Sequence, residues 1–153
     1  MRVAIGSDER SGLTDAILKW LEGQGSEVTL HGPLIEEELG WPAVAREVAE
    51  SVARGEADEG ILLCWTGTGV SIAANKVPGI RAALCDDAET ARGARLWNNA
   101  NVLCLSLRRV SNVMAVEILE TWYETSYQPN QEDDACLDAV RQIEQAYAKL
   151  DNG

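Results

Sequence analysis

A cysteine followed by two closely spaced glycines is the feature of this sequence that most directly indicates chemistry. Cys64 ends the apolar run 60–63, and Gly67 and Gly69 alternate with threonines before the small residues that begin at Val70. The run predicts a buried strand, and the small residues predict a helix. Glycines can adopt positive φ and leave room for a ligand, and the first N–H groups of a helix are unpaired. This junction would therefore stabilise an anion, or an oxygen that becomes one.

Cys64 stands at the mouth of this junction, where the same positive field favours the thiolate over the thiol. A buried thiol at a strand end beside a tight turn is the alternative interpretation. The flanking threonines, Thr66 and Thr68, favour the reactive thiol.

Few other residues could transfer protons. His31 is the only histidine, and a lone histidine at a strand end is more often a capping or surface residue than a catalyst. The remaining candidate bases are the carboxylates Asp8, Glu9, Asp86 and Asp87. Asp86 and Asp87 are best suited to starting a helix, where their charge fits the helix dipole.

The two glycines also suggest a dinucleotide site, because Asp86 and Asp87 follow about twenty residues later. However, the third glycine position is Ile72, the helix is short and the motif lies on the third strand. The pattern favours a small substrate.

Further residues that could contact a ligand flank the last strand. Trp97 heads an asparagine-rich loop on the amino side of that strand and could form the wall of a pocket, although asparagines are ordinary loop residues. Arg108 and Arg109 follow the strand at its carboxyl end, where an arginine could pair with an acidic ligand, with Asp8 or with Glu9.

Strand-like segments alternate with helical ones along the chain. Strands are expected at 2–6, 27–31, 60–64, 80–85 and 101–105, and helices after Ser11, Pro42 and Gly69 and at 88–97 and 113–123. This alternation predicts one α/β domain over 1–153, a three-layer doubly wound sandwich with a parallel sheet in the order 2-1-3-4-5. Ligands bind such sheets beyond the carboxyl ends of the strands, where Asp8 and Cys64 would face each other.

An additional C-terminal helix follows no strand and carries an apolar stripe of Leu137, Val140, Ile143, Tyr147 and Leu150. It could pack on its own domain or reach across to another copy of the chain.

Composition limits the possible partners. The net charge of −12 and the pI of about 4.4 argue against a nucleic-acid or anionic-membrane partner. The four cysteines lack Cys-x-x-Cys spacing and histidine partners, so free thiols and no metal site are expected. No leader or membrane-spanning run is evident, which predicts a cytoplasmic protein.

The sequence resembles the family of type B ribose-5-phosphate isomerases and galactose-6-phosphate isomerase subunits. The resemblance rests on the stretch CWTGTGVSIAANKVPGI at 64–80, the opening AIGSD at 4–8 and the segment 98–105, and it extends from residue 1 to about residue 125. It implies dimers or tetramers of flavodoxin-like domains. Such proteins interconvert aldose and ketose phosphates through an enediolate, without metal or cofactor.

The resemblance also implies roles for individual residues. Cys64 resembles the base that moves a proton between the first two sugar carbons, and Thr66 resembles the hydroxyl that assists at the ring oxygen. Amides of the loop 65–69 would hold the enediolate oxygens. The substrate-binding set would comprise Asp8, Glu9, Trp65, Gly67, Thr68, Gly69, Trp97, Asn98 and Arg108.

Several positions depart from the family pattern. Glu9 and Trp97 stand where the family has histidines, and the segment 132–137 lacks the usual phosphate-binding arginines. Trp65 replaces a glycine, and Trp41 replaces a common tyrosine. The first three departures remove positive charge or proton carriers.

The sequence therefore predicts an aldose–ketose isomerase with Cys64 as base, acting on a sugar or sugar phosphate other than ribose 5-phosphate, as a homodimer or homotetramer. A bulkier, unphosphorylated or open-chain sugar could stack on Trp65 and Trp97. The alternatives are a non-catalytic module that binds a sugar or nucleotide, and one subunit of a hetero-oligomeric isomerase.

Overall fold

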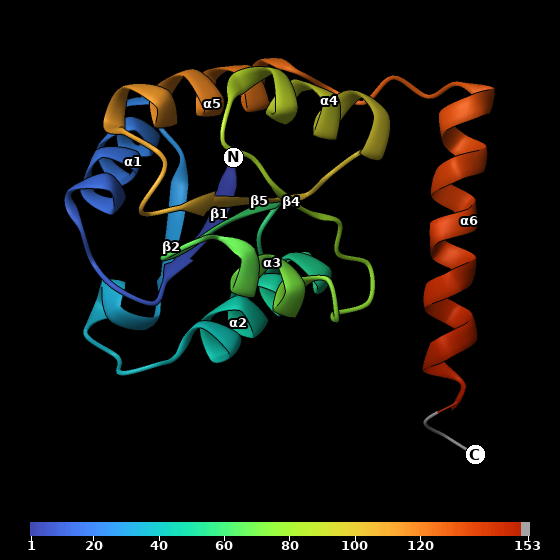
Figure 1. The fold of residues 1–153 in the computed structure, drawn as a ribbon, viewed down its shortest axis with the longest axis horizontal. Helices are drawn as coiled ribbons and strands as arrows, with labels where there is room; N and C mark the ends of the chain where they lie inside the picture. The colour runs from blue at the N-terminus through green and yellow to red at the C-terminus, as the bar shows by residue number, and fades with distance from the viewer. Residues whose placement is uncertain (151–153) are drawn as a thin grey trace.

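A parallel sheet forms the middle of three layers in the computed structural model, which describes residues 1–150 (Figure 1). Its strands are β1 (Arg2–Ser7), β2 (Glu27–His31), β3 (Glu59–Cys64), β4 (Ala82–Leu84) and β5 (Val102–Ser106). One face is covered by α1 (Gly12–Gly23), α4 (Ala88–Asn98) and α5 (Asn112–Glu124), and the other by α2 (Trp41–Ala53) and α3 (Thr68–Ala74). A short 3-10 helix, η1 (Gly32–Ile35), precedes α2, and α6 (Gln131–Ala148) stands apart.

The predicted fold class is confirmed, but the order of the last two strands is different. The strands lie in the order β2-β1-β3-β5-β4, so β5, not β4, pairs with β3. All five residues of β5 are buried, whereas the three residues of β4 are partly exposed. Interior strands of a parallel sheet are covered on both faces and need a run of bulky apolar residues, which β5 has at 102–105, whereas β4 has only three residues, two of them alanines. The short strand therefore occupies the edge.

The handedness of the connections explains which helix covers which face. From β1 to β2 and from β4 to β5 the chain moves across the sheet in one direction, and from β2 to β3 and from β3 to β4 in the other. Because these crossovers are right-handed, α1 and α4 share one face and α2 and α3 share the opposite one.

The core has two halves, one on each face of the sheet, because successive strand residues point to opposite sides. Val3, Ile5, Ile61, Leu63 and Leu103 belong to the half under α1, α4 and α5. Ala4, Leu62, Cys64, Val102 and Cys104 belong to the half under α2 and α3. All four cysteines are free thiols.

Two helix starts confirm their predicted caps. Ser11 caps α1 through its side-chain oxygen, which accepts from the Thr14 N–H at 3.3 Å. The Asp87 carboxylate likewise accepts from the Thr90 N–H at 2.7 Å and begins α4. These contacts satisfy N–H groups that a helix leaves unpaired.

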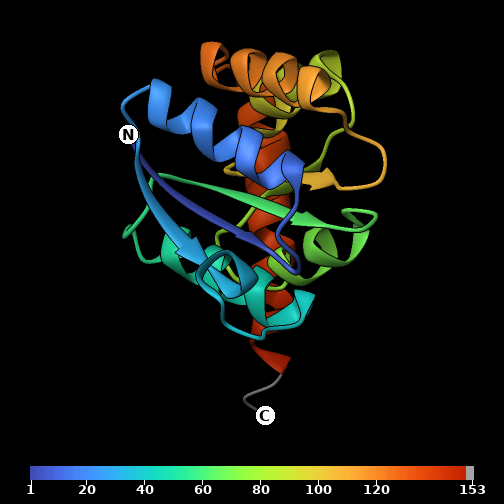
Figure 2. The same ribbon diagram turned by 90° about the vertical axis from the view of Figure 1, so that its left-hand side faces the viewer.

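α6 leaves the three layers and runs along their β4 side. In a view turned by 90°, α6 lies behind the sheet, on the side opposite β2 (Figure 2). Its entire length is described, and none of its residues is buried. No helix within residues 1–150 is long and apolar enough to cross a membrane.

The open edge at β4 is held by one side chain of the stretch 64–80, on which the family resemblance rests. The Asn75 amide donates to the Ala82 carbonyl at 2.9 Å and accepts from the Ala82 N–H at 2.8 Å. It thus pairs with the edge as a neighbouring strand would.

We expect Asn75→Ala to lower the free energy of unfolding by about 1–2 kcal/mol, because both hydrogen bonds to Ala82 are lost. Chemical denaturation should show a lower midpoint with an unchanged slope. Asn112→Ala, at an exposed position on α5, is the control and should leave the midpoint unchanged. Equal midpoints for Asn75→Ala and the wild type would show that Asn75 does not stabilise the edge.

Candidate active site

The strand–helix junction lies at the carboxyl edge of the sheet and is held from the loop after β5. Cys64 ends β3 and is 4% exposed. Its carbonyl accepts from the Leu107 N–H at 3.0 Å. The next carbonyl, that of Trp65, accepts from the Arg108 N–H at 3.1 Å and from the Ser106 hydroxyl at 3.0 Å. The backbone that carries the candidate base is therefore fixed on one side.

The two positions of the junction are glycines for different physical reasons. Gly67 has a φ of 75°, as predicted, and a Cβ there would lie 2.5 Å from Leu84 Cδ1 and 2.9 Å from the Leu105 carbonyl carbon. Gly69 does not have a positive φ, which corrects the expectation for this residue. A Cβ on Gly69 would instead lie 3.0 Å from the indole ring of Trp41. Gly69 therefore makes room for Trp41.

Tryptophans give this edge an aromatic surface. Trp41, at the start of α2, is 42% exposed, and Trp65 is 60% exposed. From the sequence, Trp41 is only a departure from the family pattern and is not among the predicted site residues. The sequence signal for a bulky neighbour was Gly69, because the Trp41 ring lies where a side chain on Gly69 would be.

The two threonines of the junction are neighbours. The Thr66 and Thr68 hydroxyl oxygens lie 2.6 Å apart, and both side chains are exposed. One hydroxyl donates to the other, so the pair has one further donor to offer a ligand.

The structure brings Asp8 to Cys64, as predicted. β1 pairs with β3, and the Asp8 N–H donates to the Leu63 carbonyl at 3.3 Å. The Oδ1 atom of Asp8 is shielded from solvent and has no hydrogen-bond partner within the described residues. Burial, followed by the charge of Glu9, raises the pKa of the Asp8 carboxyl. A buried acceptor without a partner is costly, so a ligand that donates to Oδ1 would be favoured.

Neither of the arginines that could pair with this carboxylate forms an ion pair with it in residues 1–150. Arg109 pairs with Asp86 at 3.1 Å instead of with Asp8 or Glu9. Arg108 is exposed, and its side chain has no ion-pair partner in residues 1–150. It remains available to an anionic ligand at the carboxyl edge.

The dinucleotide interpretation finds no support in this geometry. Asp87 caps α4, Asp86 pairs with Arg109, and α3 has only seven residues. The sole histidine, His31, pairs through Nδ1 with Glu47 at 3.0 Å.

Trp97 and Asn98 do not join this group within one chain. They end α4, which returns the chain to the amino edge of the sheet before β5. The candidate substrate contacts therefore fall into two sets at opposite ends of the strands.

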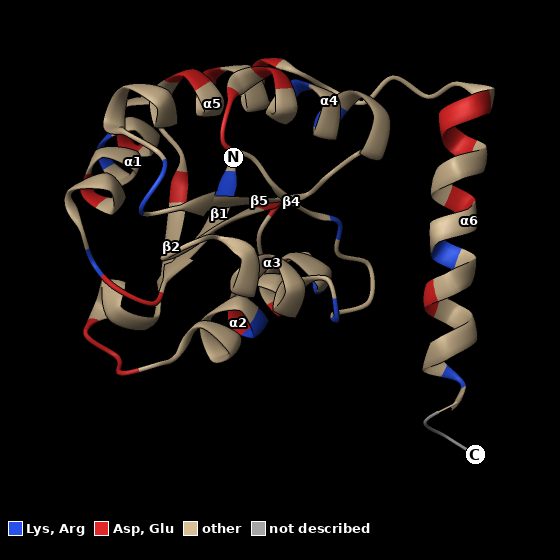
Figure 3. Cartoon of the chain, in the orientation of Figure 1, with Lys and Arg blue, Asp and Glu red and all other residues tan. Residues whose placement is uncertain are grey.

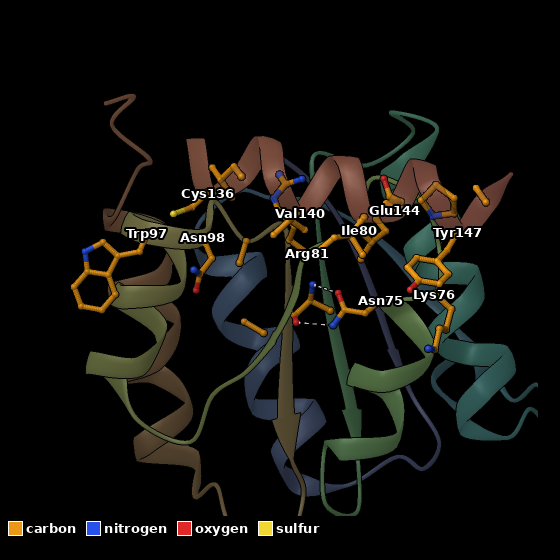
Figure 4. Close-up of a pocket in the computed structure, with 17 residues that line it drawn as sticks. Asn75, Lys76, Ile80, Arg81, Trp97, Asn98, Cys136, Val140, Glu144 and Tyr147 are labelled. Carbon is orange, nitrogen blue, oxygen red and sulfur yellow. Dashed lines mark hydrogen bonds between the residues drawn. The ribbon is translucent and has the colours of Figure 1, made fainter. Parts of the chain in front are cut away.

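A groove lies between the body and α6, next to the second set (Figure 4). It has a volume of about 1120 Å³. Trp97 and Asn98 line it from α4, Arg81 lines it beside β4, and Cys136 and Tyr147 line it from α6. The Gly79 N–H donates to Glu144 at 2.9 Å across it.

Comparisons with known proteins agree with the geometry. A family model described as Ribose/Galactose Isomerase matches residues 3–140. Ribose-5-phosphate isomerase B of Escherichia coli is 37% identical over 145 residues, which cover 94% of this chain and 97% of that protein. D-erythrulose-4-phosphate isomerase of Pectobacterium atrosepticum is 38% identical over 131 residues, 84% of this chain and 86% of that one.

The solved structure of Clostridium thermocellum ribose-5-phosphate isomerase B is similar to this chain with a TM-score of 0.89 and 39% identity. The match covers 96% of this chain and 99% of the solved one. The likeness therefore extends over almost all of the chain that the structure describes.

We expect Asp8→Asn to stabilise the fold at about pH 7. The raised pKa means that the folded chain holds this proton more tightly than the unfolded chain, so the carboxyl lowers stability as pH rises from the unfolded pKa to the folded one. The amide removes that cost. Thermal unfolding should show a higher Tm, by about 2–4 °C for each kcal/mol relieved.

At about pH 3, below the ordinary value of 3.8, the difference between Asp8→Asn and the wild type should disappear. Asp15→Asn, which removes an exposed carboxylate paired with Arg10, is the control and should give no gain at about pH 7. A lower Tm for Asp8→Asn at about pH 7 would contradict the interpretation.

Proposed function

Because the chain belongs to the ribose/galactose isomerase family, we propose that it is an aldose–ketose isomerase in which Cys64 is the catalytic base. The supporting observation is that Cys64 ends β3 next to the end of β1, where Asp8 follows the strand and leaves its Oδ1 unpaired within the described residues. A base and a hydrogen-bonding carboxyl next to each other are what proton transfer along a sugar chain needs.

The reaction requires one proton to move between neighbouring carbons. The Cys64 thiolate takes the proton from the second carbon of an open-chain aldose, and the electron pair of that C–H bond moves toward the carbonyl to give an enediolate. The thiol then returns the proton to the first carbon, and the hydroxyl proton of the second carbon moves to the first oxygen, which leaves a ketose. Donors around the junction, including the Thr66 and Thr68 hydroxyls, would stabilise the charged oxygen.

We propose a substrate other than ribose 5-phosphate. Glu9 adds negative charge beside Asp8, and the first turn of α6 is acidic, with Glu132, Asp133 and Asp134 (Figure 3). A phosphate group near either of them would be repelled. Trp41 and Trp65 offer aromatic faces that pack against the C–H faces of a sugar.

We further propose that the working form is a homodimer with shared sites. The stripe of α6 that lines the groove includes Val140, Ile143 and Tyr147, each more than half exposed, and Ile72 of α3 is 61% exposed. A helix without buried residues gains little stability alone, whereas a second copy would cover this stripe and the β4 edge.

A dimer of this kind would also reunite the two sets of site residues. A two-fold axis perpendicular to the strands places the amino edge of one sheet against the carboxyl edge of the other. Trp97 and Asn98 of one copy would then reach the Cys64 junction of the other, so each site would need both chains.

We expect Cys64→Ala to abolish isotope exchange. Incubation of the wild type with a panel of aldoses, ketoses and their phosphates in heavy water should introduce deuterium at the second carbon. Loss of the base should slow this by at least about 10²-fold. Exchange measured by NMR would report the chemistry directly.

Cys85→Ala is the matched control. Cys85 belongs to the core on the opposite face of the sheet from Cys64, and burial raises its pKa to about 12, so it is a neutral thiol. Its loss should leave exchange unchanged. Retained exchange in Cys64→Ala would assign the base to another residue. A sugar that raises Tm without exchanging would indicate a binding module, and exchange that needs another family member would indicate a hetero-oligomer.

Mixing two impaired variants tests the shared site. Cys64→Ala lacks the base, and the double variant Trp97→Ala, Asn98→Ala lacks the contacts from the amino edge. After the chains are dissociated, mixed in equal amounts and reassembled, half of the dimers should be mixed, and each of these should contain one intact site. Activity should return to about a quarter of the wild-type value. No recovery in proven mixed dimers would show that the site is built within one chain.

A further inference from the structure

The turn between α4 and β5 is held more firmly than an exposed loop needs to be. It follows the last two residues of α4, Trp97, which is 57% exposed, and Asn98, which is also exposed. Asn99 adopts a left-handed conformation with a φ of 44°. Neither Trp97 nor Asn98 has a side-chain hydrogen bond within residues 1–150, yet the backbone around them is clamped from two sides.

Arg95 forms the inner clamp. Its Nη1 donates to the Ala100 carbonyl at 2.6 Å, and its Nε donates to the Thr125 carbonyl at 3.1 Å. Its Nη2 pairs with Glu59 at 2.7 Å. One guanidinium thus ties together the end of the turn, the residue that follows α5 and the start of β3. Only a planar group with several donors can reach three acceptors in this way.

The clamp is buried and closed on its far side. The side chains of Arg95 and Glu59 are 14% and 11% exposed. The remaining oxygen of Glu59 accepts from Trp122 Nε1 at 2.7 Å, and the Arg95 guanidinium lies 5.0 Å from the centre of that ring. A buried ion pair often adds little net stability compared with apolar residues, so stability alone does not explain this arrangement.

Arg81 forms the outer clamp. Its Nε donates to the Asn99 carbonyl at 2.8 Å, and its own N–H donates to the Asn101 side chain at 2.8 Å. The Asn101 amide in turn donates to the Gly79 carbonyl at 3.0 Å. Side chains therefore fix three successive residues, from Asn99 to Asn101.

The Trp97 ring lies against its own helix. A Cβ on Gly93, one helical turn earlier, would lie 2.7 Å from the Trp97 ring. The six-membered ring of the indole therefore lies close to α4 at Gly93, and the absence of a side chain there is what permits it.

We propose that Arg95 is a positioning residue that pre-orders Trp97 and Asn98 for the substrate site of a second copy of this chain. This inference rests on the proposed function and on its shared site. Ordering the turn before binding removes an entropic cost that a mobile turn would impose on substrate. Because Arg95 also holds the Thr125 carbonyl, it fixes the start of the linker to α6 at the same time.

Arg95→Lys tests the role. Lysine keeps a charge beside Glu59 but cannot donate to Glu59, Ala100 and Thr125 together. For the sugar that the wild type turns over best, we expect KM to rise about ten- to hundredfold with kcat less affected, since the turn contributes to binding. Arg92→Lys, on the same helix but partly exposed and paired only with Glu89 within residues 1–150, should leave both constants unchanged.

A double-mutant cycle separates positioning from simple loss of stability. In the background Trp97→Ala, Asn98→Ala, the clamp has nothing left to position, so Arg95→Lys should change kcat/KM by less than about twofold. Its effect on Tm should be the same in both backgrounds. If kcat/KM falls equally in both backgrounds, Arg95 does not act through these side chains.

Hydrogen exchange gives a readout that needs no activity. Arg95→Lys should speed amide exchange at Ala100 and Asn101 at least about tenfold relative to other α4 amides. Unchanged protection there would overturn the inference even if the wild type proved inactive on every sugar, which would by itself overturn only the proposed function. If Arg95→Lys does not fold, the pair Arg95→Met, Glu59→Gln removes both charges together and keeps an oxygen for Trp122 Nε1.

Discussion

The direction of the strands in the parallel sheet is the constraint on which the site depends. Every strand ends at one edge, and every helix returns the chain to the other. Asp8, Cys64 and Arg108 follow or end strands and therefore meet at the carboxyl edge. Trp97 and Asn98 end a helix and must lie at the amino edge. No local change in sequence could bring the two sets together within one such domain, so a site that uses both requires a second chain.

The hydrophobic pattern sets where the strands lie within this frame. β3 is buried at all six positions and β5 at all five, so both occupy the interior of the sheet, whereas the short β4 closes its edge with help from Asn75. This order has a consequence for the junction, because the neighbour of β3 is β5. The loop after β5 holds the carbonyls of Cys64 and Trp65, and Leu105 leaves no room for a side chain on Gly67.

Much of this arrangement could be predicted from sequence, because it follows from local rules. The caps Ser11 and Asp87 and the placement of Cys64 at a strand end depend on a few adjacent residues. The order of β4 and β5 could not be predicted in the same way, since both are short runs with small or apolar residues and their rank depends on what covers them. The reason for Gly69 lies on a different element, at Trp41, and the partner of Arg109 is Asp86 instead of the carboxylates after β1. Such pairings form only when distant segments meet.

The single chain leaves several favourable interactions unmade, and they share a physical logic. One carboxylate oxygen of Asp8 is shielded from solvent and has no donor within residues 1–150, and α6 exposes an apolar stripe. Two arginines order a turn next to Trp97 and Asn98, whose side chains form no hydrogen bond within the same residues. Each of these costs free energy in an isolated domain, because burial, exposure or ordering is not compensated. Substrate would compensate the first and a second copy the other two. Since the turn and the carboxylate would meet in one site, binding of substrate and association of chains should each favour the other.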